Sequence, residues 1–184
     1  MRRHIAELVR LWADFTKPTG VVYEFGSRLV EPTKRDMCNL RQFFPDAKYI
    51  GCDIETGENV DAIMDITNIQ LISGMADAVI CVESLEHVRY PWKAASEVYR
   101  ILKGHGVAIF SSVFQFQIHN PPDYWRYSPQ GFEALFEMFQ GLIVDWAGAP
   151  LNPHTVVAYC WKGGLPEGMT QFLNRTQEWM QKAG

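Results

Sequence analysis

The sequence lacks the cysteine patterns that mark disulfide-rich and zinc-binding proteins. Its 184 residues include four cysteines, which lie far apart: Cys38, Cys52, Cys81 and Cys160. Neither a CxxC motif nor a cysteine–histidine spacing of zinc type occurs among them. We therefore expect reduced thiols and no bound metal.

Long hydrophobic runs and an excess of positive charge are also missing. No stretch reaches the roughly 20 apolar residues needed to span a membrane, and the first residues do not form a signal-peptide pattern. The formal net charge is −4, whereas a nucleic-acid partner requires a basic face. These absences predict a cytoplasmic protein without stable membrane insertion and without a nucleic-acid partner.

The residues that are present alternate between strand-like and helix-like patterns. Apolar runs of strand length predict strands at 21–26, 47–53, 62–65, 76–82, 107–113, 141–146 and 155–161. Amphipathic periodicity predicts helices at 1–16, 34–44, 91–103, 129–139 and 166–182. Thr33 and Ser128 are the expected N-caps of two of these helices. Glycine and proline predict a turn at 103–106 and a loop at 148–153.

This order of elements predicts an α/β fold. Helices between the early strands indicate a mostly parallel sheet. The 148–153 connection is too short for a crossover helix, so the last two strands should pair antiparallel. We expect a Rossmann-like, seven-stranded, mostly parallel sheet with an antiparallel last strand and helices on both faces. Residues 1–184 should form one domain, with a core at 20–162 between the two terminal helices.

Two strand ends carry residues that suit a nucleoside. Gly26 follows the first strand and lets the backbone approach a ligand closely. Asp53 ends the second strand 27 residues later, where its carboxylate can accept hydrogen bonds from ribose hydroxyls. Asp65 and Glu83-Ser84 follow two further strands, whose carboxyl ends should meet at the same edge. A nicotinamide dehydrogenase would share Asp53, but its G-x-G-x-x-G motif is absent.

Several segments resemble the class I S-adenosylmethionine-dependent methyltransferases, over about residues 20–162. Val22–Gly26 looks like the first motif of that family, and Gly51–Ile54 looks like its second strand. The most specific match is Asp77–Val88, which is similar to the fourth strand and following loop of the small-molecule, type 11-like branch. The segment 119–129 also looks like the corresponding loop of a sub-branch whose members are assigned to sugar and metabolite modification.

The resemblance implies S-adenosyl-L-methionine as the cofactor. In the family pattern an acid such as Asp53 holds the ribose, and the end of the third strand meets the adenine. The implied cofactor residues are Glu24, Gly26, Ser27, Asp53, Ile54, Asp65, Ile66, Glu83 and Ser84. Each acid also has a plainer interpretation, as a solvated strand-end charge, a helix cap or a turn residue.

The chain departs from the family pattern directly after Gly26. The family's first motif usually carries two further glycines there, whereas this loop reads Ser27-Arg28-Leu29-Val30-Glu31-Pro32. We expect a differently shaped loop, in which the side chains of Ser27 and Arg28 contact the methionine part of the cofactor. The alternative is a non-catalytic cofactor-binding or partner-interaction module.

The acceptor is expected to meet polar residues of the 114–128 loop. His119 follows the fifth strand and is the candidate general base, with Asp123 to orient it or act in its place. His87, Tyr124 and Arg126 are candidate substrate contacts, and the Arg126 fork would suit a carboxylate or phosphate. In the alternative, His87 bonds to nearby backbone and Arg126 holds a packed loop through backbone carbonyls.

The sequence therefore predicts a methyltransferase that acts on oxygen or nitrogen of a small molecule, such as a sugar or another metabolite. Within 184 residues there is little room for an inserted substrate domain. We expect the terminal helix and the 114–128 loop to complete the acceptor site, or a second subunit of a homodimer to do so.

Overall fold

The computed structural model describes residues 3–149 and 151–183, with side chains up to residue 178. Positions 1–2 of the expected N-terminal helix therefore lie outside the described residues. The strands are β1 (Val21–Phe25), β2 (Lys48–Asp53), β3 (Ala62–Ile63), β4 (Ala76–Val82), β5 (Leu102–Val113), β6 (Gly141–Ala149) and β7 (Asn152–Trp161). The α-helices are α1 (Arg3–Thr16), α2 (Arg35–Cys38), α3 (Pro91–Ile101), α4 (Pro129–Leu135) and α5 (Met169–Ala183). Three 3-10 turns complete the elements: η1 (Pro32–Lys34), η2 (Leu40–Phe43) and η3 (Leu85–His87).

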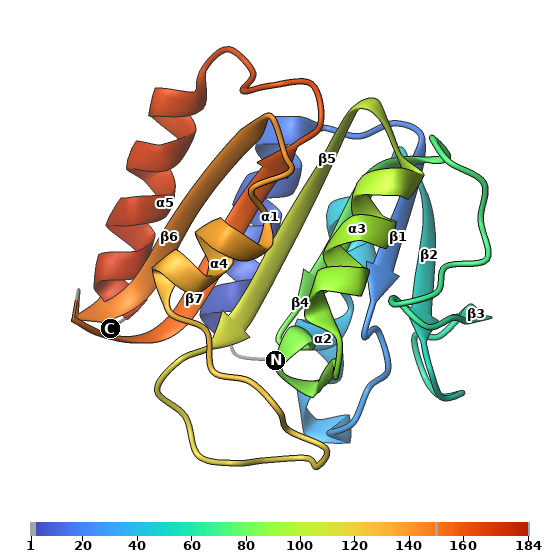
Figure 1. Cartoon of the computed structure of the whole chain (residues 1–184), viewed down its shortest axis with the longest axis horizontal. Coiled ribbons are helices and arrows are strands. Elements are labelled where there is room, and N and C mark those ends of the chain that lie inside the picture. The colour runs from blue at the N-terminus through green and yellow to red at the C-terminus, as the bar shows by residue number, and fades with distance from the viewer. Residues whose placement is uncertain (1–2, 150, 184) are drawn as a thin grey trace.

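The strands form one seven-stranded sheet in the order β3-β2-β1-β4-β5-β7-β6 (Figure 1). β1 pairs in parallel with both β2 and β4, and β4 pairs in parallel with β5. β7 runs antiparallel to both β5 and β6. The predicted fold class, a mostly parallel Rossmann-like sheet with an antiparallel last strand, is confirmed.

Helices cover both faces of the sheet because its central strands are apolar on both sides. In β4 every residue except Asp77 is buried, and its side chains alternate between two cores. α3 and α4 pack on one face, and α1, η2 and α5 pack on the other (Figure 1). Among the described residues, no helix combines the length and apolar character needed to cross a bilayer.

The expected helix at 34–44 is wrong as a single element. The segment forms η1, the four-residue α2 and η2 in succession, because the backbone of Asn39 (φ −86°, ψ 79°) leaves the helical region. Thr33 lies inside η1 and is therefore not an N-cap. The apolar residues of this segment still reach the core, since Leu40 and Phe44 are buried against α1.

Two expected connections belong to strands instead. Leu102 pairs with Ala76 and Val107 pairs with Ala78, so the expected turn at 103–106 bulges out of β5 opposite Asp77. Lys103 stabilises this bulge by donating to the Asp77 carboxylate at 2.7 Å. The expected loop at 148–153 lies mostly in the β6–β7 hairpin.

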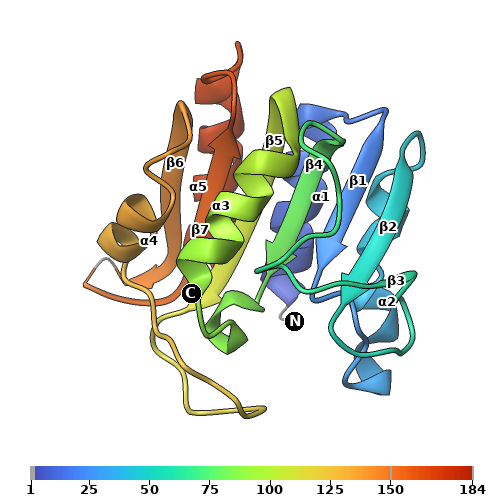
Figure 2. The same ribbon diagram turned by 45° about the vertical axis from the view of Figure 1, so that its right-hand side comes forward.

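The sheet topology gathers the carboxyl ends of β1, β2, β4 and β5 at one edge. Figure 2 shows these four ends together, with the long loop from β5 to α4 below them. A ligand of an open parallel sheet binds at such an edge, next to the point where strand order reverses. That point lies between β1 and β4.

The N-cap predicted at Ser128 is confirmed, and it joins this loop to α4. The Ser128 hydroxyl accepts from the Gly131 N–H at 3.1 Å, and Pro129 occupies the first helical position.

We expect Ser128→Ala to lower the free energy of unfolding by about 1 kcal/mol, measured by urea denaturation. Ser73 is exposed and offers a matched control. Ser73→Ala should change the free energy of unfolding by less than about 0.5 kcal/mol. Equal effects of the two substitutions would contradict the cap.

Candidate active site

A cavity of about 410 Å³ opens at the carboxyl ends of β1, β2 and β4. Its volume is typical of a site for a small organic ligand. Two groups of polar residues line it, one around Gly26 and Asp53 and one around Glu86 and His119. α5 contributes no lining residue among those described, so the expectation that the terminal helix helps to form the acceptor site is wrong. α5 packs instead with α1 in the core on the other face of the sheet from α3 and α4.

The turn after β1 brings backbone to the cavity at Gly26. This residue has φ +83°, and a Cβ added to it would lie 2.1 Å from the Ser84 hydroxyl oxygen. The N–H groups of Gly26 and Ser27 both donate to the carbonyl of Cys52, which ties the turn to β2. Glycine is therefore required here for both conformation and space.

Ser27 brings a buried hydroxyl to the same wall. The residue is 2% exposed, and its Oγ has no hydrogen-bond partner within the described part of the chain. A buried polar atom without a partner is costly. A ligand with a polar group at this position would satisfy it.

Glu24 is a second buried polar residue at the end of β1. The Tyr49 hydroxyl donates to its carboxylate at 2.8 Å. Burial raises the pKa of Glu24 from 4.5 to about 7, and the Tyr49 hydrogen bond and the Arg41 charge oppose the rise only in part. A cationic ligand group would favour the charged form of this carboxyl.

Asp53 ends β2 with its carboxylate facing the loop after β1. It accepts from the N–H groups of Arg28 at 3.3 Å and Glu55 at 3.1 Å, which leaves lone pairs on both oxygens for a ligand. The guanidinium of Arg28 pairs with Glu55 at 3.0 Å and lies 4.0 Å from Asp53. Arg28 is therefore held at the Asp53 end of the cavity.

The remaining predicted cofactor residues divide into two groups. Ile54 is 69% exposed beside the cavity, and Ile66 lines the cavity as well. Asp65 does not line it, because its carboxylate accepts from the N–H and hydroxyl of Thr67 at 2.7 and 2.8 Å. Asp65 thus adopts the plain turn that was its alternative interpretation.

Glu83 and Ser84 form the wall between the two groups of polar residues. Glu83 follows β4 with φ +48°, a conformation that a non-glycine residue adopts only where its surroundings hold it. Its N–H donates to the Ser111 carbonyl at 2.9 Å, and the Ser84 hydroxyl donates to the Val82 carbonyl at 3.0 Å. Both residues line the cavity, as predicted from their position at a strand end.

The 114–128 loop is held together by an ionic network around Asp123. Arg126 donates to its two carboxylate oxygens at 2.6 and 2.7 Å, and the His119 N–H donates at 2.9 Å. Arg126 also donates to the carbonyls of Phe116, Gln117 and Trp125. These contacts, of Arg126 above all, hold the pKa of Asp123 well below its usual range.

Two predicted substrate contacts lie outside the cavity. All five N–H donors of Arg126 are occupied within its own loop, so its guanidinium has no donor left for a substrate anion. Tyr124 is exposed, and its N–H donates to the carbonyl of Glu86. Asp123 is also absent from the cavity wall and reaches it through His119.

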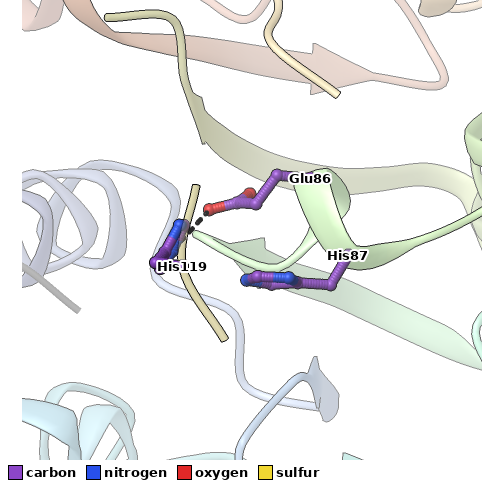
Figure 3. A group of neighbouring side chains, drawn as sticks. All are labelled: Glu86, His87 and His119. Atoms are coloured by element: carbon purple, nitrogen blue, oxygen red, sulfur yellow. Dashed lines mark ion pairs between the residues drawn. The ribbon is translucent and has the colours of Figure 1, made fainter. Parts of the chain in front are cut away.

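His119 and His87 do reach the cavity, and Glu86 joins them (Figure 3). Sequence reasoning missed Glu86. It is fully buried, it accepts from the Ser112 hydroxyl at 2.7 Å, and burial raises its pKa. The available signal was a carboxylate directly after the buried Leu85, in a segment predicted to follow a buried strand.

Comparison with known proteins agrees with this geometry. The family model described as "Methyltransferase domain" matches residues 33–110. None of the curated protein sequences matches the chain. A S-adenosylmethionine-dependent methyltransferase from Archaeoglobus fulgidus is similar in structure, with a TM-score of 0.63 at 14% identity, covering 85% of this chain and 94% of that one.

Two further solved structures share the fold. One is a possible histamine N-methyltransferase from Thermotoga maritima (TM-score 0.59, 19% identity, 84% and 88% coverage). The other is 1,6-didemethyltoxoflavin-N1-methyltransferase from Burkholderia thailandensis with bound S-adenosylhomocysteine (TM-score 0.64, 12% identity, 86% and 78% coverage). At these identities the likeness concerns the fold.

The family model and the fold together indicate a methyltransferase domain in this chain. The match covers less than half of the chain, and the structural likeness to S-adenosylmethionine-dependent methyltransferases concerns the fold. S-adenosyl-L-methionine is the cofactor that the sequence predicts, and S-adenosylhomocysteine is bound in the Burkholderia thailandensis structure. The residues present fit this cofactor, since the cavity offers the close approach at Gly26, the unpartnered Ser27 hydroxyl and the Asp53 carboxylate.

The raised pKa of Glu24 makes a prediction about stability and pH. The folded protein binds a proton at Glu24 more tightly than the unfolded chain does, so this residue lowers stability as pH rises from about 4.5 to about 7. Replacing Glu24 by glutamine should remove up to about 3 kcal/mol of this dependence. Relative to wild type, Glu24→Gln should be more thermostable at pH 8 than at pH 5, measured by calorimetry. A stability difference independent of pH would contradict the assignment.

Proposed function

We propose that the enzyme transfers the methyl group of S-adenosylmethionine to an oxygen or nitrogen of a small-molecule acceptor, such as a sugar or another metabolite. One observation carries the proposal: a single cavity of about 410 Å³ joins a nucleoside-type half to a half that carries two histidines. A cavity of this size favours a small acceptor over a macromolecule.

In the proposed cofactor half, each residue meets a part of the ligand that suits its chemistry. Asp53 accepts hydrogen bonds from the ribose hydroxyls, and Ile54 and Ile66 pack against the adenine. The Glu24 carboxylate faces the amino group, and the Ser27 hydroxyl meets the methionine carboxylate. Gly26 allows the backbone to approach closely. When bound, the cofactor supplies an electrophilic methyl carbon on a sulfonium sulfur.

In the proposed acceptor half, His119 removes the proton of the acceptor hydroxyl or amine. Its Nδ1 lies 3.1 Å from the Asp123 carboxylate, which must accept because it is ionised. This contact orients the ring with Nε2 toward Glu86, inside the cavity wall. Asp123 is thus a positioning residue, and its low pKa argues against a role as the base.

The second candidate is a non-catalytic cofactor-binding module. The glycine-poor loop after Gly26 favours it, and the family-model match begins at residue 33, after that loop. The polar acceptor half favours the enzyme, because a binding module has no need of an oriented histidine beside the cofactor site. The residues of one chain already line both halves of the cavity, so the site does not need a second subunit to complete it. A homodimer stays a prediction.

Cofactor binding tests the proposed role of Asp53. In isothermal calorimetry we expect Asp53→Ala to weaken S-adenosylhomocysteine binding about tenfold to a hundredfold, since a hydrogen bond to a charged group contributes about 1.5–3 kcal/mol. Glu58→Ala is the matched control, because Glu58 pairs with Arg35 outside the cavity. Wild type that binds neither S-adenosylmethionine nor its product would refute the proposal. Unchanged binding by Asp53→Ala would refute the ribose assignment alone.

Turnover tests the proposed role of His119. With an acceptor identified from a panel of hydroxylated and amino metabolites, His119→Ala should lower kcat about 10²- to 10⁴-fold. Its affinity for S-adenosylhomocysteine should remain that of wild type. His105→Ala, at the exposed β5 bulge, should leave both quantities unchanged. A full-rate His119→Ala variant would show that no proton passes through this residue.

A further inference from the structure

The acceptor half contains a compact group of potential metal ligands. One ligand atom each from Glu86, His87 and His119 lies within 4.8 Å of the other two. Figure 3 shows the three side chains pointing toward one another, two from η3 and one from the 114–128 loop. Neither the fold nor the methyl-transfer chemistry requires this arrangement.

Hydrogen bonds fix both histidines in the form that binds metals. His87 Nδ1 lies 2.8 Å from the Pro122 carbonyl, which can only accept. His119 Nδ1 lies 3.1 Å from the Asp123 carboxylate, whose two oxygens both accept from Arg126. In the neutral rings Nδ1 therefore carries the hydrogen, and Nε2 has a free lone pair. Such a partner on the second ring nitrogen is the usual support of a metal-binding histidine.

Glu86 supplies an independent sign that a ligand belongs here. Its side chain is 0% exposed, and Oε2 accepts from the Ser112 hydroxyl. Oε1 has no hydrogen-bond partner within the described part of the chain, and it lies 4.0 Å from His119 Nε2. A buried carboxylate oxygen without a partner is costly unless it is protonated or meets a cation.

We propose that Glu86, His87 and His119 bind a divalent transition-metal ion, with Zn²⁺ as the reference case. Two imidazoles and one carboxylate are a common ligand set for such an ion and leave coordination positions open. Metal–ligand distances near 2.0–2.2 Å put tetrahedral ligands about 3.4 Å apart. Side-chain movements of about 1 Å would close the present cluster to that size. The proposal revises the expectation of no metal that followed from the absence of cysteine motifs.

An ion bound there would lie at the wall of the cavity that would hold the acceptor, since all three ligand residues line that cavity. An oxygen of the acceptor coordinated there would have a lower pKa, so its proton would pass to solvent water. In that metal-bound form His119 Nε2 would hold the ion, and the role of His119 as base proposed above would apply to the metal-free enzyme. This role favours acceptors with two neighbouring oxygens that can chelate. The role rests on the proposed function, whereas binding of the ion does not.

Metal binding to the chelator-stripped whole protein tests the inference. Titration with Zn²⁺ against a chromophoric competitor should give one ion per chain. Glu86→Gln, His87→Ala and His119→Ala should each weaken binding at least tenfold, and Asp123→Asn about 10- to 100-fold. Co²⁺ should give a visible absorption spectrum that these variants lose. His105→Ala should bind like wild type. Circular dichroism and S-adenosylhomocysteine affinity check that each variant is folded.

Failure of this inference can be told apart from failure of the proposed function. Wild type that binds S-adenosylhomocysteine but no Zn²⁺, or that binds Zn²⁺ equally in all variants, would overturn the metal site alone. Turnover that is unaffected by chelation but lost in His119→Ala would overturn the proposed metal site and support His119 as the base. Asp53→Ala should lose cofactor affinity and keep Zn²⁺ affinity, which supports two separate sites in one cavity.

Discussion

The parallel pairing of β1 with β2 and β4 is the constraint on which the site depends. It sets Gly26, Asp53 and Glu83 at one edge of the sheet, although they come from three separate parts of the chain. The carbonyl of Cys52 receives both the Gly26 and the Ser27 N–H groups, so the first turn cannot move independently of β2. A slip of register in either pair would separate the Asp53 carboxylate from Gly26.

The acceptor half depends on a different interaction, the ionic network of Asp123. Arg126 and the His119 N–H hold the Asp123 carboxylate, and that carboxylate in turn holds the His119 ring. The network therefore holds the His119 side chain in place among the residues of this loop that line the cavity. The Trp125 indole donates to the Val88 carbonyl and anchors the same loop to η3, where Glu86 and His87 lie. The two segments that carry the histidine cluster (Glu86, His87 and His119) are thus fixed to one another.

Much of the fold could be predicted from residue patterns. The continuous apolar run of β4 and the short link before β7 sufficed for the sheet and its antiparallel strand. The helix at 34–44 could not be predicted correctly, because its apolar periodicity persists while Asn39 breaks the backbone. The bulge at 103–106 likewise depends on pairing across the sheet, which local glycine content does not reveal.

The candidate site was predictable where strand ends set it, as at Gly26, Asp53 and Ser84. For the other candidate residues, hydrogen-bond partners within the chain determine whether they can contact a ligand. Asp65 and Arg126 have the chemistry of ligand contacts, but neither lines the cavity: Thr67 donates to one Asp65 oxygen, and Asp123 binds Arg126. Glu86 was not singled out from the sequence, and its burial and its unpartnered oxygen identify it in the structure. His87 and His119 lie far apart in the sequence, so no local spacing could join them.

The central claim is that the Asp53 end of the cavity holds the nucleoside of the cofactor and the histidine cluster faces its reactive end. A crystal structure with S-adenosylhomocysteine tests it most directly. The account predicts both ribose hydroxyls within hydrogen-bond distance of the Asp53 carboxylate, and the sulfur on the side of His119. A nucleoside bound elsewhere, or a sulfur directed away from Glu86, His87 and His119, would contradict it.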